Sequence, residues 1–274
     1  MELGINIRNW GPTATREFLT ESAIIVDNSS IDALWFNDHI GFPPEIKNNV
    51  FGVPKEMGSI IDPLGLACYF ASVTKRVRFG TGVLVLPYRP ALLTNKLLTA
   101  IQILSGDRFL LGIGAGYLAE EFQALGVPIK KRGKITNEIL ALLNESSENP
   151  LVESHDQAFL LEPKLSKPPI YIGQNAEIAF ERAIRYGDGW MPVSQSPEEL
   201  KPKIKTFQSM AEDAGRGTLE VVAMKTLPLE NDSEANELVE SYKDVGVSQL
   251  VHTQGYESVK QYAEIVNQVE KLRV

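Results

Sequence analysis

A histidine next to an aspartate, at the end of an apolar run, is the first candidate for chemistry in this chain. The run Trp35-Phe36-Asn37 leads directly into Asp38 and His39. A neutral imidazole can take or give a proton near neutral pH, and a neighbouring carboxylate can set its orientation or its pKa. We therefore predict that His39 and Asp38 are catalytic residues, and the alternative is a buried Asp-His pair with only a structural role.

Glycines at two strand-to-helix junctions indicate where a cofactor could bind. The first junction contains Gly114, Ala115 and Gly116, and the second contains Ile172, Gly173, Gln174 and Asn175. Glycine lets a backbone approach a ligand closely, and a helix that starts at such a turn directs free amides toward an anion. Each turn taken alone is more often only a turn, but together they predict a cofactor site.

A third glycine motif lies inside a strand rather than after one. Gly80, Thr81, Gly82 and Val83 interrupt the apolar run from Val77 to Leu86. Glycines inside a strand weaken it unless the backbone bulges or something packs directly against them. A flat ring is one group that could pack there.

These residues need a framework, and alternating strands and helices supply one. Apolar runs predict strands at Glu2 to Ile7, Ala33 to Asn37, Val77 to Leu86, Phe109 to Gly114, Pro169 to Gly173, Gly189 to Val193, Glu220 to Leu227 and Ser248 to Thr253. A helical pattern follows each strand. Eight such units without a linker predict one (β/α)₈ TIM barrel over residues 1 to 274, with a doubly wound open sheet as the alternative. In a barrel, functional residues lie at the C-terminal ends of the strands.

Several local patterns give further expectations. The helix after Pro90 has Leu93, Leu97, Ile101 and Leu104 on one stripe, and a later helix is expected to start at an Asn175 cap. We interpret Gly41 to Ile61 as part of a substrate wall, with a pocket lined by Trp10, Phe42, Pro43, Phe51 and Tyr117. Glu145 to Lys167 is expected to be a solvated connection. Of the other histidines, His155 and His252 are expected to be structural or exposed.

Composition limits the partners. The 274 residues carry a net charge of −8, which argues against nucleic acid or an anionic membrane as a partner. The single cysteine, Cys68, lies in an apolar helical run and is expected to be a buried, inert thiol. The chain shows no leader pattern and no membrane-spanning run, so we expect a cytoplasmic protein. We assign no metal ligands.

Many short motifs recur in one order along the chain. They are Trp35-Phe36-Asn37-Asp38-His39, Asp62-Pro63, Gly80 to Pro87, Leu104 to Arg108, Leu111 to Gly116, Glu121 to Gly126, Arg132-Gly133, Pro168 to Ile170 and Tyr186 to Trp190. This series resembles the bacterial-luciferase-like superfamily, and within it the branch that uses the deazaflavin coenzyme F420. The resemblance covers Leu3 to Val193.

The resemblance implies roles for individual residues. His39 would lie over the deazaflavin ring, and a non-proline cis peptide bond between Gly82 and Val83 would form a bulge behind it. Gly114, Ala115, Gly116 and Tyr117 would flank the ring, with Asp38 beside His39. Gly173, Gln174, Asn175 and Ala176, after Ile172, would receive the phosphate through backbone amides. We expect a small organic substrate and a homodimer.

The chain also departs from the usual pattern of this branch. Arg89-Pro90 is one residue shorter than the usual motif, Gln102 replaces an aspartate, and Gly173-Gln174 replaces paired glycines. The connection from Leu227 to Ser233 is short. Three hypotheses therefore stay open: a coenzyme F420-dependent oxidoreductase, an FMN-dependent monooxygenase that uses a partner reductase and oxygen, and a non-catalytic flavoprotein.

Overall fold

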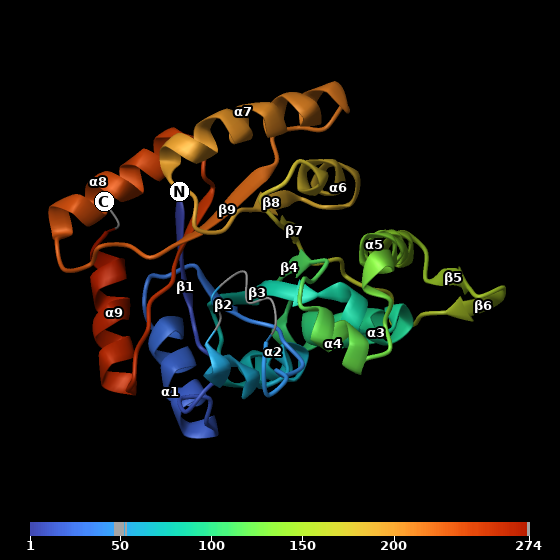
Figure 1. Ribbon diagram of the computed structural model, residues 1–274, viewed down its shortest axis with the longest axis horizontal. Helices are drawn as coiled ribbons and strands as arrows, with labels where there is room; N and C mark the ends of the chain where they lie inside the picture. The colour runs from blue at the N-terminus through green and yellow to red at the C-terminus, as the bar shows by residue number, and fades with distance from the viewer. Residues whose placement is uncertain (47–51, 53, 273–274) are drawn as a thin grey trace.

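The apolar runs form the eight parallel strands of a closed barrel in the computed structural model, which describes residues 1–46, 52 and 54–272 (Figure 1). Around the barrel the order is β1, β10, β9, β8, β7, β4, β3 and β2. The strands are β1 (Glu2–Asn6), β2 (Ala33–Phe36), β3 (Arg78–Val85), β4 (Phe109–Gly114), β7 (Ile170–Gly173), β8 (Gly189–Met191), β9 (Glu220–Lys225) and β10 (Gln249–His252). The predicted (β/α)₈ barrel is confirmed.

Helices cover the outside of the barrel. They are α1 (Arg16–Asp27), α2 (Pro63–Val73), α3 (Ala91–Ser105), α4 (Ala119–Ala124), α5 (Arg132–Glu148), α6 (Ile178–Tyr186), α7 (Pro197–Asp213), α8 (Asp232–Asp244) and α9 (Val259–Lys271), with short 3₁₀ turns η1 (Lys55–Gly58), η2 (Leu86–Tyr88) and η3 (Ile129–Lys131). Caps fix their starts: the Asp62 carboxylate accepts from two first-turn amides of α2, and Ser196 and Glu199 form a capping box on α7. None of the helices in the described part of the chain is long and apolar enough to cross a membrane.

Close contact between β3 and β4 explains two of the strand glycines. A Cβ atom on Gly80 would lie 2.4 Å from the Leu110 carbonyl oxygen, and one on Gly112 would lie 2.1 Å from the Thr81 carbonyl oxygen. Neither position has room for a side chain. Gly80 is therefore required by the neighbouring strand, whereas the register shift between Thr81 and Leu84 marks a bulge at Gly82 and Val83.

The segment expected to be a solvated connection contains regular structure. Helix α5 continues to Glu148, and β5 (Leu151–Ser154) pairs antiparallel with β6 (Gln157–Leu160). The hairpin turns at His155 and Asp156, which both have positive φ. The alternation of apolar and polar residues over such short strands is too weak to distinguish a hairpin from a loop.

The predicted stripe of α3 is buried at Ile101 and exposed at Leu93, Leu97 and Leu104. Two other local predictions are wrong. Helix α6 has Glu177 rather than Asn175 at its N-cap. Cys68 is half-buried rather than buried.

Candidate functional site

Three consecutive side chains after β2 reach three different partners. The Asn37 side-chain amide donates to the carbonyl of Gly82 at 3.1 Å. The Asp38 carboxylate accepts from the backbone amide of Val85 at 2.8 Å. His39 Nδ1 lies 2.9 Å from Glu121 Oε2. The end of β2 is thus tied to both sides of the β3 bulge, which fixes the position of His39.

Asp38 belongs to an ion cluster and not to the histidine. Arg89 donates from both terminal nitrogens to the two Asp38 oxygens, at 2.7 and 2.9 Å, and also to Asp62 at 2.7 Å. Burial by itself lowers the pKa of Arg89, but these carboxylates outweigh it and raise the pKa, so the guanidinium stays charged. The predicted orientation of His39 by Asp38 is therefore wrong, and Asp38 instead anchors Arg89.

The carboxylate that holds His39 is Glu121 on α4. Its Oε2 atom accepts from His39 Nδ1 and from the Tyr88 hydroxyl at 2.8 Å, while Oε1 accepts from the amides of Ile40 and Gly41. Both oxygens thus carry two donors, and Glu121 is buried. The loop after β2 and the η2 turn therefore both contact this one carboxylate of α4.

These contacts set the protonation states. Burial raises the pKa of a carboxyl group, but the hydrogen bonds from His39, Tyr88 and Ile40 outweigh it and hold the pKa of Glu121 below its usual value. Burial and the Glu121 carboxylate raise the pKa of Tyr88, so its hydroxyl stays a donor. An ionised carboxylate only accepts, so the Nδ1 atom of His39 carries a proton and Nε2 remains on the opposite edge of the ring.

Aromatic rings surround His39. The Phe42 ring lies edge-on to the imidazole with 4.8 Å between centroids, and Tyr117 lies at 6.1 Å, also edge-on. His39 is 8% exposed. Of the other predicted lining residues, Trp10 pairs with Ile60 and lies under the Arg8 guanidinium. Pro43 is half-buried, and Phe51 lies outside the described residues.

The β3 bulge carries the expected cis peptide bond between Gly82 and Val83. The half-buried Val83 side chain lies between two glycines: a Cβ on Gly114 would be 2.8 Å from Val83 Cγ2, and one on Gly173 would be 2.7 Å from Val83 Cγ1. The two predicted glycine turns therefore meet at this valine. Their missing side chains make room for Val83 at the mouth of the barrel.

The turn after β7 is bound to the turn after β8. The Asn175 side chain donates to the Val193 carbonyl and accepts from its amide, both at 3.1 Å, and the Gln174 carbonyl accepts from Trp190 Nε1 at 2.7 Å. Helix α6 starts after this turn without a side-chain cap. The amides of Ala179 and Phe180 donate to the Ala176 and Glu177 carbonyls, so the backbone amides that could bind an anion are those of the turn before them.

The turn after β4 differs from this one. Gly116 has a φ of +78°, and a Cβ there would lie 2.7 Å from Val85. Helix α4 has two acidic residues, Glu120 and Glu121, in its first turn. The positive end of this helix thus faces carboxylates, as does that of α6, where Glu177 is the N-cap residue and Glu181 lies in the first turn.

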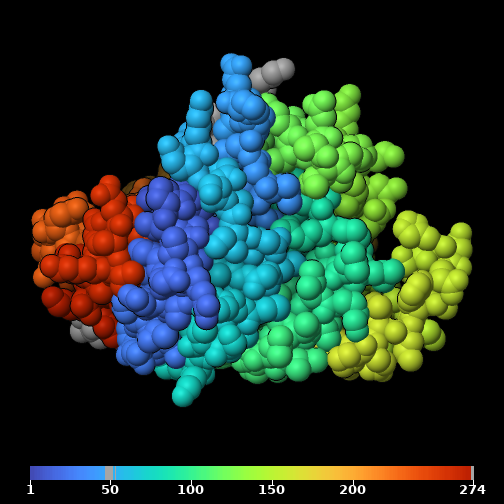
Figure 2. Space-filling view, turned by 90° about the horizontal axis from the view of Figure 1, so that it is seen from below, coloured from blue at the N-terminus to red at the C-terminus, as the bar shows by residue number. Residues whose placement is uncertain are grey.

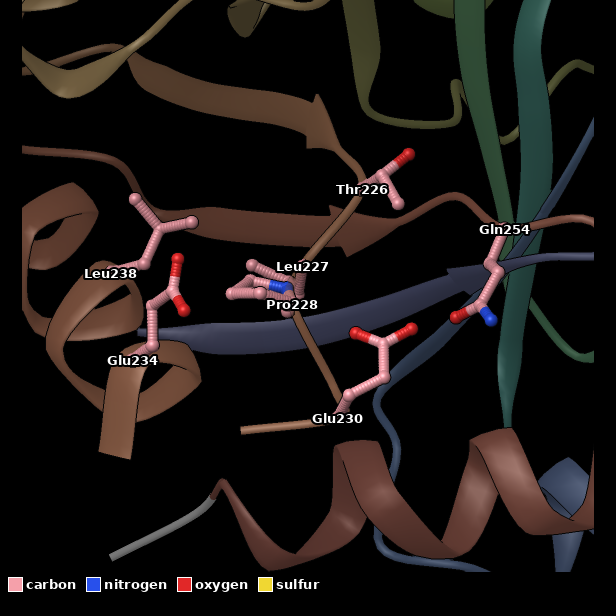
Figure 3. Close-up of a pocket in the computed structure, with 7 residues that line it drawn as sticks. All are labelled: Thr226, Leu227, Pro228, Glu230, Glu234, Leu238 and Gln254. Atoms are coloured by element: carbon pink, nitrogen blue, oxygen red, sulfur yellow. The ribbon is translucent and has the colours of Figure 1, made fainter. Parts of the chain in front are cut away.

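A hollow separate from the His39 region lies at the β9 and β10 ends of the barrel (Figure 3). It has a volume of about 550 Å³ and is lined by Thr226, Leu227, Pro228, Glu230, Glu234, Leu238 and Gln254. His252 lies beneath it, where Nδ1 accepts from the Leu227 amide and Nε2 lies 3.0 Å from Gln254 Oε1. This hollow contains none of the residues around His39.

The sequence from residue 3 to residue 270 matches the family model described as luciferase-like monooxygenase. The chain belongs to this family.

Relatives of this luciferase-like chain include proteins with named cofactors. An uncharacterized protein of Mycobacterium tuberculosis is 33% identical over 162 residues, which is 57% of this chain and 56% of that protein. The F420-dependent glucose-6-phosphate dehydrogenase of Amycolatopsis mediterranei is 27% identical over 71% of this chain and 60% of its own length. The chain thus spans little more than half the length of these relatives.

Solved structures of similar fold divide between two chemistries. The monooxygenase RslO1 from Streptomyces bottropensis superposes with a TM-score of 0.81 at 16% identity, covering 100% of this chain and 98% of that one. An F420-dependent secondary alcohol dehydrogenase with an F420-acetone adduct gives 0.76 at 16% identity and 98% coverage of both chains. A type II Baeyer-Villiger monooxygenase from Pseudomonas putida, in complex with FMN, gives 0.76 at 14% identity, covering 98% of this chain and 96% of that one. These similarities support the fold.

Sequence reasoning about this luciferase-like chain missed the groups that support His39. Glu121 lies in the motif Glu121 to Gly126, and Arg89 was noted only as part of a shortened motif. No feature of the sequence indicates a role for Tyr88. Their roles depend on contacts 33 to 82 residues apart in sequence, which no local pattern reports.

Proposed function

We propose that the protein is an oxidoreductase that moves a hydride between coenzyme F420 and a small organic substrate at the rim around His39. The dehydrogenase of Amycolatopsis mediterranei, which is named for F420, supports this assignment, and a 5,10-methylenetetrahydromethanopterin reductase of Archaeoglobus fulgidus is a further relative named for a reduction. The fold is shared with an F420-dependent alcohol dehydrogenase.

The observation that carries the proposal is the contact between His39 and the buried Glu121. A hydride adds two electrons and one hydrogen to a substrate carbon, so the atom next to that carbon needs a proton to complete the reduction. A histidine paired with an ionised carboxylate is suited to supply that proton, because the carboxylate stabilises the protonated ring. Since Nδ1 is held by Glu121, Nε2 is the atom that exchanges the proton with the substrate.

The residues at the barrel mouth fit a flat ring with a phosphate tail. The Val83 side chain, lodged where Gly114 and Gly173 lack one, would support one face of the ring. Tyr117 would lie at its edge beside His39, and Ala115 and Gly116 would flank it. When bound, the deazaflavin supplies the hydride and does not add oxygen.

The phosphate has a separate place in this proposal. The turn from Gly173 to Ala176 is anchored by Asn175 to Val193, so its backbone is fixed before any ligand arrives. The backbone amides of this turn, ahead of the bonded amides of Ala179 and Phe180, would bind the phosphate. The Asn175 side chain is already engaged and so would act as a clamp on the turn instead of a direct ligand.

An FMN-dependent monooxygenase is the second candidate. It is supported by the TM-scores of RslO1 and of the FMN-bound Baeyer-Villiger enzyme, which equal or exceed that of the alcohol dehydrogenase. The same ring and phosphate sites would serve FMN. Reduced FMN reacts with oxygen, whereas reduced deazaflavin reacts poorly with it, so turnover distinguishes the two.

Turnover in two arms tests the proposal. In one arm, the protein is mixed with reduced F420 and a panel of small ketones, aldehydes and activated alkenes, and reappearance of oxidised F420 is followed. In the other, it receives FMN, a flavin reductase, NADH and oxygen, and oxygen uptake beyond that of the reductase alone is measured. We expect turnover in the first arm only. Turnover in the second arm alone would establish the monooxygenase, and binding without turnover in either arm would favour a non-catalytic flavoprotein.

A further inference from the structure

Arg8, two residues beyond β1, has a guanidinium group without a polar partner. It is half-buried, and within the described chain it forms no ion pair and donates no side-chain hydrogen bond. The other arginines that the structure describes as buried or half-buried all donate from their side chains; they are Arg78, Arg89, Arg108, Arg182 and Arg216. A guanidinium is always charged and carries five N–H donors, so an unpaired one at the barrel mouth is suited to bind an anion.

Aromatic rings hold this guanidinium in place instead. Its central carbon lies 4.6 Å from the centroid of the Trp10 ring and 5.5 Å from that of the Tyr256 ring. The Tyr256 ring is itself stacked on Phe18, and its hydroxyl accepts from the Arg8 amide. A guanidinium that rests on rings keeps the N–H groups of its edge available to a ligand. The rings therefore fix the direction of Arg8 without using its donors.

Two further observations point to a ligand at this stack. The Nε1 atom of Trp10 is buried and has no hydrogen-bond partner among the described residues, which is costly for a donor. A Cβ on the exposed Gly255 would lie 2.6 Å from one guanidinium nitrogen of Arg8. The missing side chain of Gly255 thus leaves the guanidinium open at the surface.

The stack lies beside the proposed reaction site and away from the proposed phosphate turn. β1 pairs with β2, and Asn9 bonds the backbone amide and carbonyl of Asn37, at 3.0 and 2.8 Å, two residues before His39. On its other side β1 pairs with β10, and Figure 2 shows the dark blue N-terminal region beside the red C-terminal region. β7, which carries the phosphate turn, is the fourth strand from β1 in either direction around the barrel. An anion at Arg8 is therefore a different group from the cofactor phosphate.

The surrounding carboxylates limit the charge of that anion. Glu56, Glu230 and Glu257 belong to the segments around the stack, and none of them forms an ion pair with Arg8 within the described chain. Their negative charges disfavour a dianion such as phosphate, which one guanidinium would not neutralise. A carboxylate carries one charge, and its two oxygens match the fork of one guanidinium.

We propose that Arg8 binds a carboxylate of the substrate, and that the substrates are small carbonyl compounds that bear this carboxylate. This inference rests on the proposed function, because it names the substrate class of the same site. The carbonyl group would lie next to His39, and the carboxylate would reach Arg8 at the neighbouring strand end. Two contacts from adjacent strands would thus orient one small molecule.

Nuclear magnetic resonance of the indole groups tests binding without turnover. The chain has three tryptophans, and the Nε1 atoms of Trp35 and Trp190 already donate to other groups, so Trp10 is the reporter. The full-length protein, with and without F420, is titrated with the keto acid levulinate, with its uncharged methyl ester and with inorganic phosphate. We expect levulinate alone to shift the Trp10 signal to saturation.

Matched variants assign the binding to Arg8. Arg8→Gln should weaken levulinate binding by about 10-fold or more, because a charge-assisted bidentate contact is lost. Arg185→Gln is the control, since Arg185 also lies over a ring, 5.0 Å from the Tyr186 centroid, but is exposed on α6. In Gly255→Ala the added methyl group displaces the guanidinium, so levulinate binding should fall by a smaller factor. This variant keeps the test open if Arg8→Gln does not fold.

Equal binding of levulinate and its ester, or unchanged levulinate binding in Arg8→Gln, would overturn the proposal, and tighter binding of phosphate would overturn the choice of a carboxylate. Turnover with reduced F420 separates this inference from the proposed function. Arg8→Gln should lower kcat/KM for levulinate about 10-fold more than for the ester, through KM. Equal losses for the two compounds would overturn this inference alone. Levulinate binding through Arg8, without F420 turnover of any carbonyl compound, would contradict the proposed function and support the anion site.

Discussion

Two buried histidines lie at the C-terminal ends of barrel strands on different parts of the rim, and their partners differ. His39, after β2, contacts the ionised carboxylate of Glu121. His252, at the end of β10, has a backbone amide and the side chain of Gln254 as partners. Burial lowers the pKa of His252 to about 4, and its neutral partners do not restore it.

The difference shows that position at the rim does not by itself give a histidine a chemical role. A proton that arrives at His39 creates a charge that Glu121 can stabilise. A proton that arrives at His252 would create a charge in a buried environment, where the Glu230 carboxylate and Gln254 offset the cost of burial only in part, and would break the bond from the Leu227 amide. The carboxylate partner, and not the position at the strand end, is therefore our reason for proposing a chemical role for His39 and a structural role for His252.

The largest expected effect comes from removing His39, with His252 as the comparison. His39→Ala should lower the hydride-transfer rate by about 10² to 10⁴-fold, with F420 affinity changed by only a few fold, because a positioned acid or base contributes about that much. His252→Asn should leave the rate unchanged. Single-turnover kinetics with reduced F420 measures both. Equal rates for His39→Ala and the wild type would reduce the His39 cluster to a structural role.

The next effect concerns Val83. Gly173→Val places a Cβ 2.7 Å from Val83 Cγ1 and 3.0 Å from the Ile113 carbonyl oxygen. Val83 must then move, and we expect F420 affinity to fall by about 100-fold and the variant to lose about 1 to 3 kcal/mol of stability. The control is Gly65→Val, since a Cβ on Gly65 meets only Asp62 Oδ1, at 3.9 Å. Calorimetric titration and thermal melting are run on the same samples. Normal affinity in a folded Gly173→Val variant would remove the β7 end from the site.

The pH dependence of stability tests the second histidine of the comparison, His252. The pKa of His252 is about 4 in the folded protein, below that of an unfolded histidine, so the folded protein loses stability as the pH falls below about 6.5. Between about pH 6.5 and pH 5 this loss is about 2 kcal/mol. His252→Asn removes this contribution and can still accept from the Leu227 amide. Urea unfolding at both pH values should give a flatter profile for the variant, and parallel profiles would contradict the lowered pKa.

The smallest effect tests how Glu121 acts. In the wild type, each Glu121 oxygen accepts two hydrogen bonds. In Glu121→Gln, an NH₂ donor replaces one of these oxygens, and it faces either His39 and Tyr88 or the backbone amides. We expect the histidine to accept at Nδ1 and carry its proton on Nε2, with a rate about 10-fold lower. Nitrogen-15 spectra of labelled histidine report this tautomer, and Glu120→Gln is the control. An unchanged tautomer and rate would show that Glu121 does not position His39.

The fold could be predicted because it depends on patterns that are local in sequence. Each barrel strand is a short apolar run, and Asp62 and Ser196 mark helix starts with chemistry that is nearly independent of tertiary context. Helix α3 could not be oriented in the same way. Its leucines were recognised as one stripe, but sequence periodicity does not tell whether a stripe faces the barrel or the outside.

The site could be predicted in its positions but not in its pairings. The sequence indicates His39, Val83, Gly114 and Gly173, and the structure brings the last three together. Adjacency in sequence suggested Asp38 as the partner of His39. In the loop after β2, however, adjacent side chains point in different directions, and the carboxylate came from Glu121, 82 residues away.

Equilibrium binding of the two cofactors tests the central claim most directly. The wild-type protein is titrated with F420 and, separately, with FMN in a calorimeter, and His252→Asn serves as the control outside the site. We predict that F420 binds with a dissociation constant at least about 10-fold lower than that of FMN, and that the control behaves like the wild type. Tighter binding of FMN, or no binding of F420, would contradict the assignment.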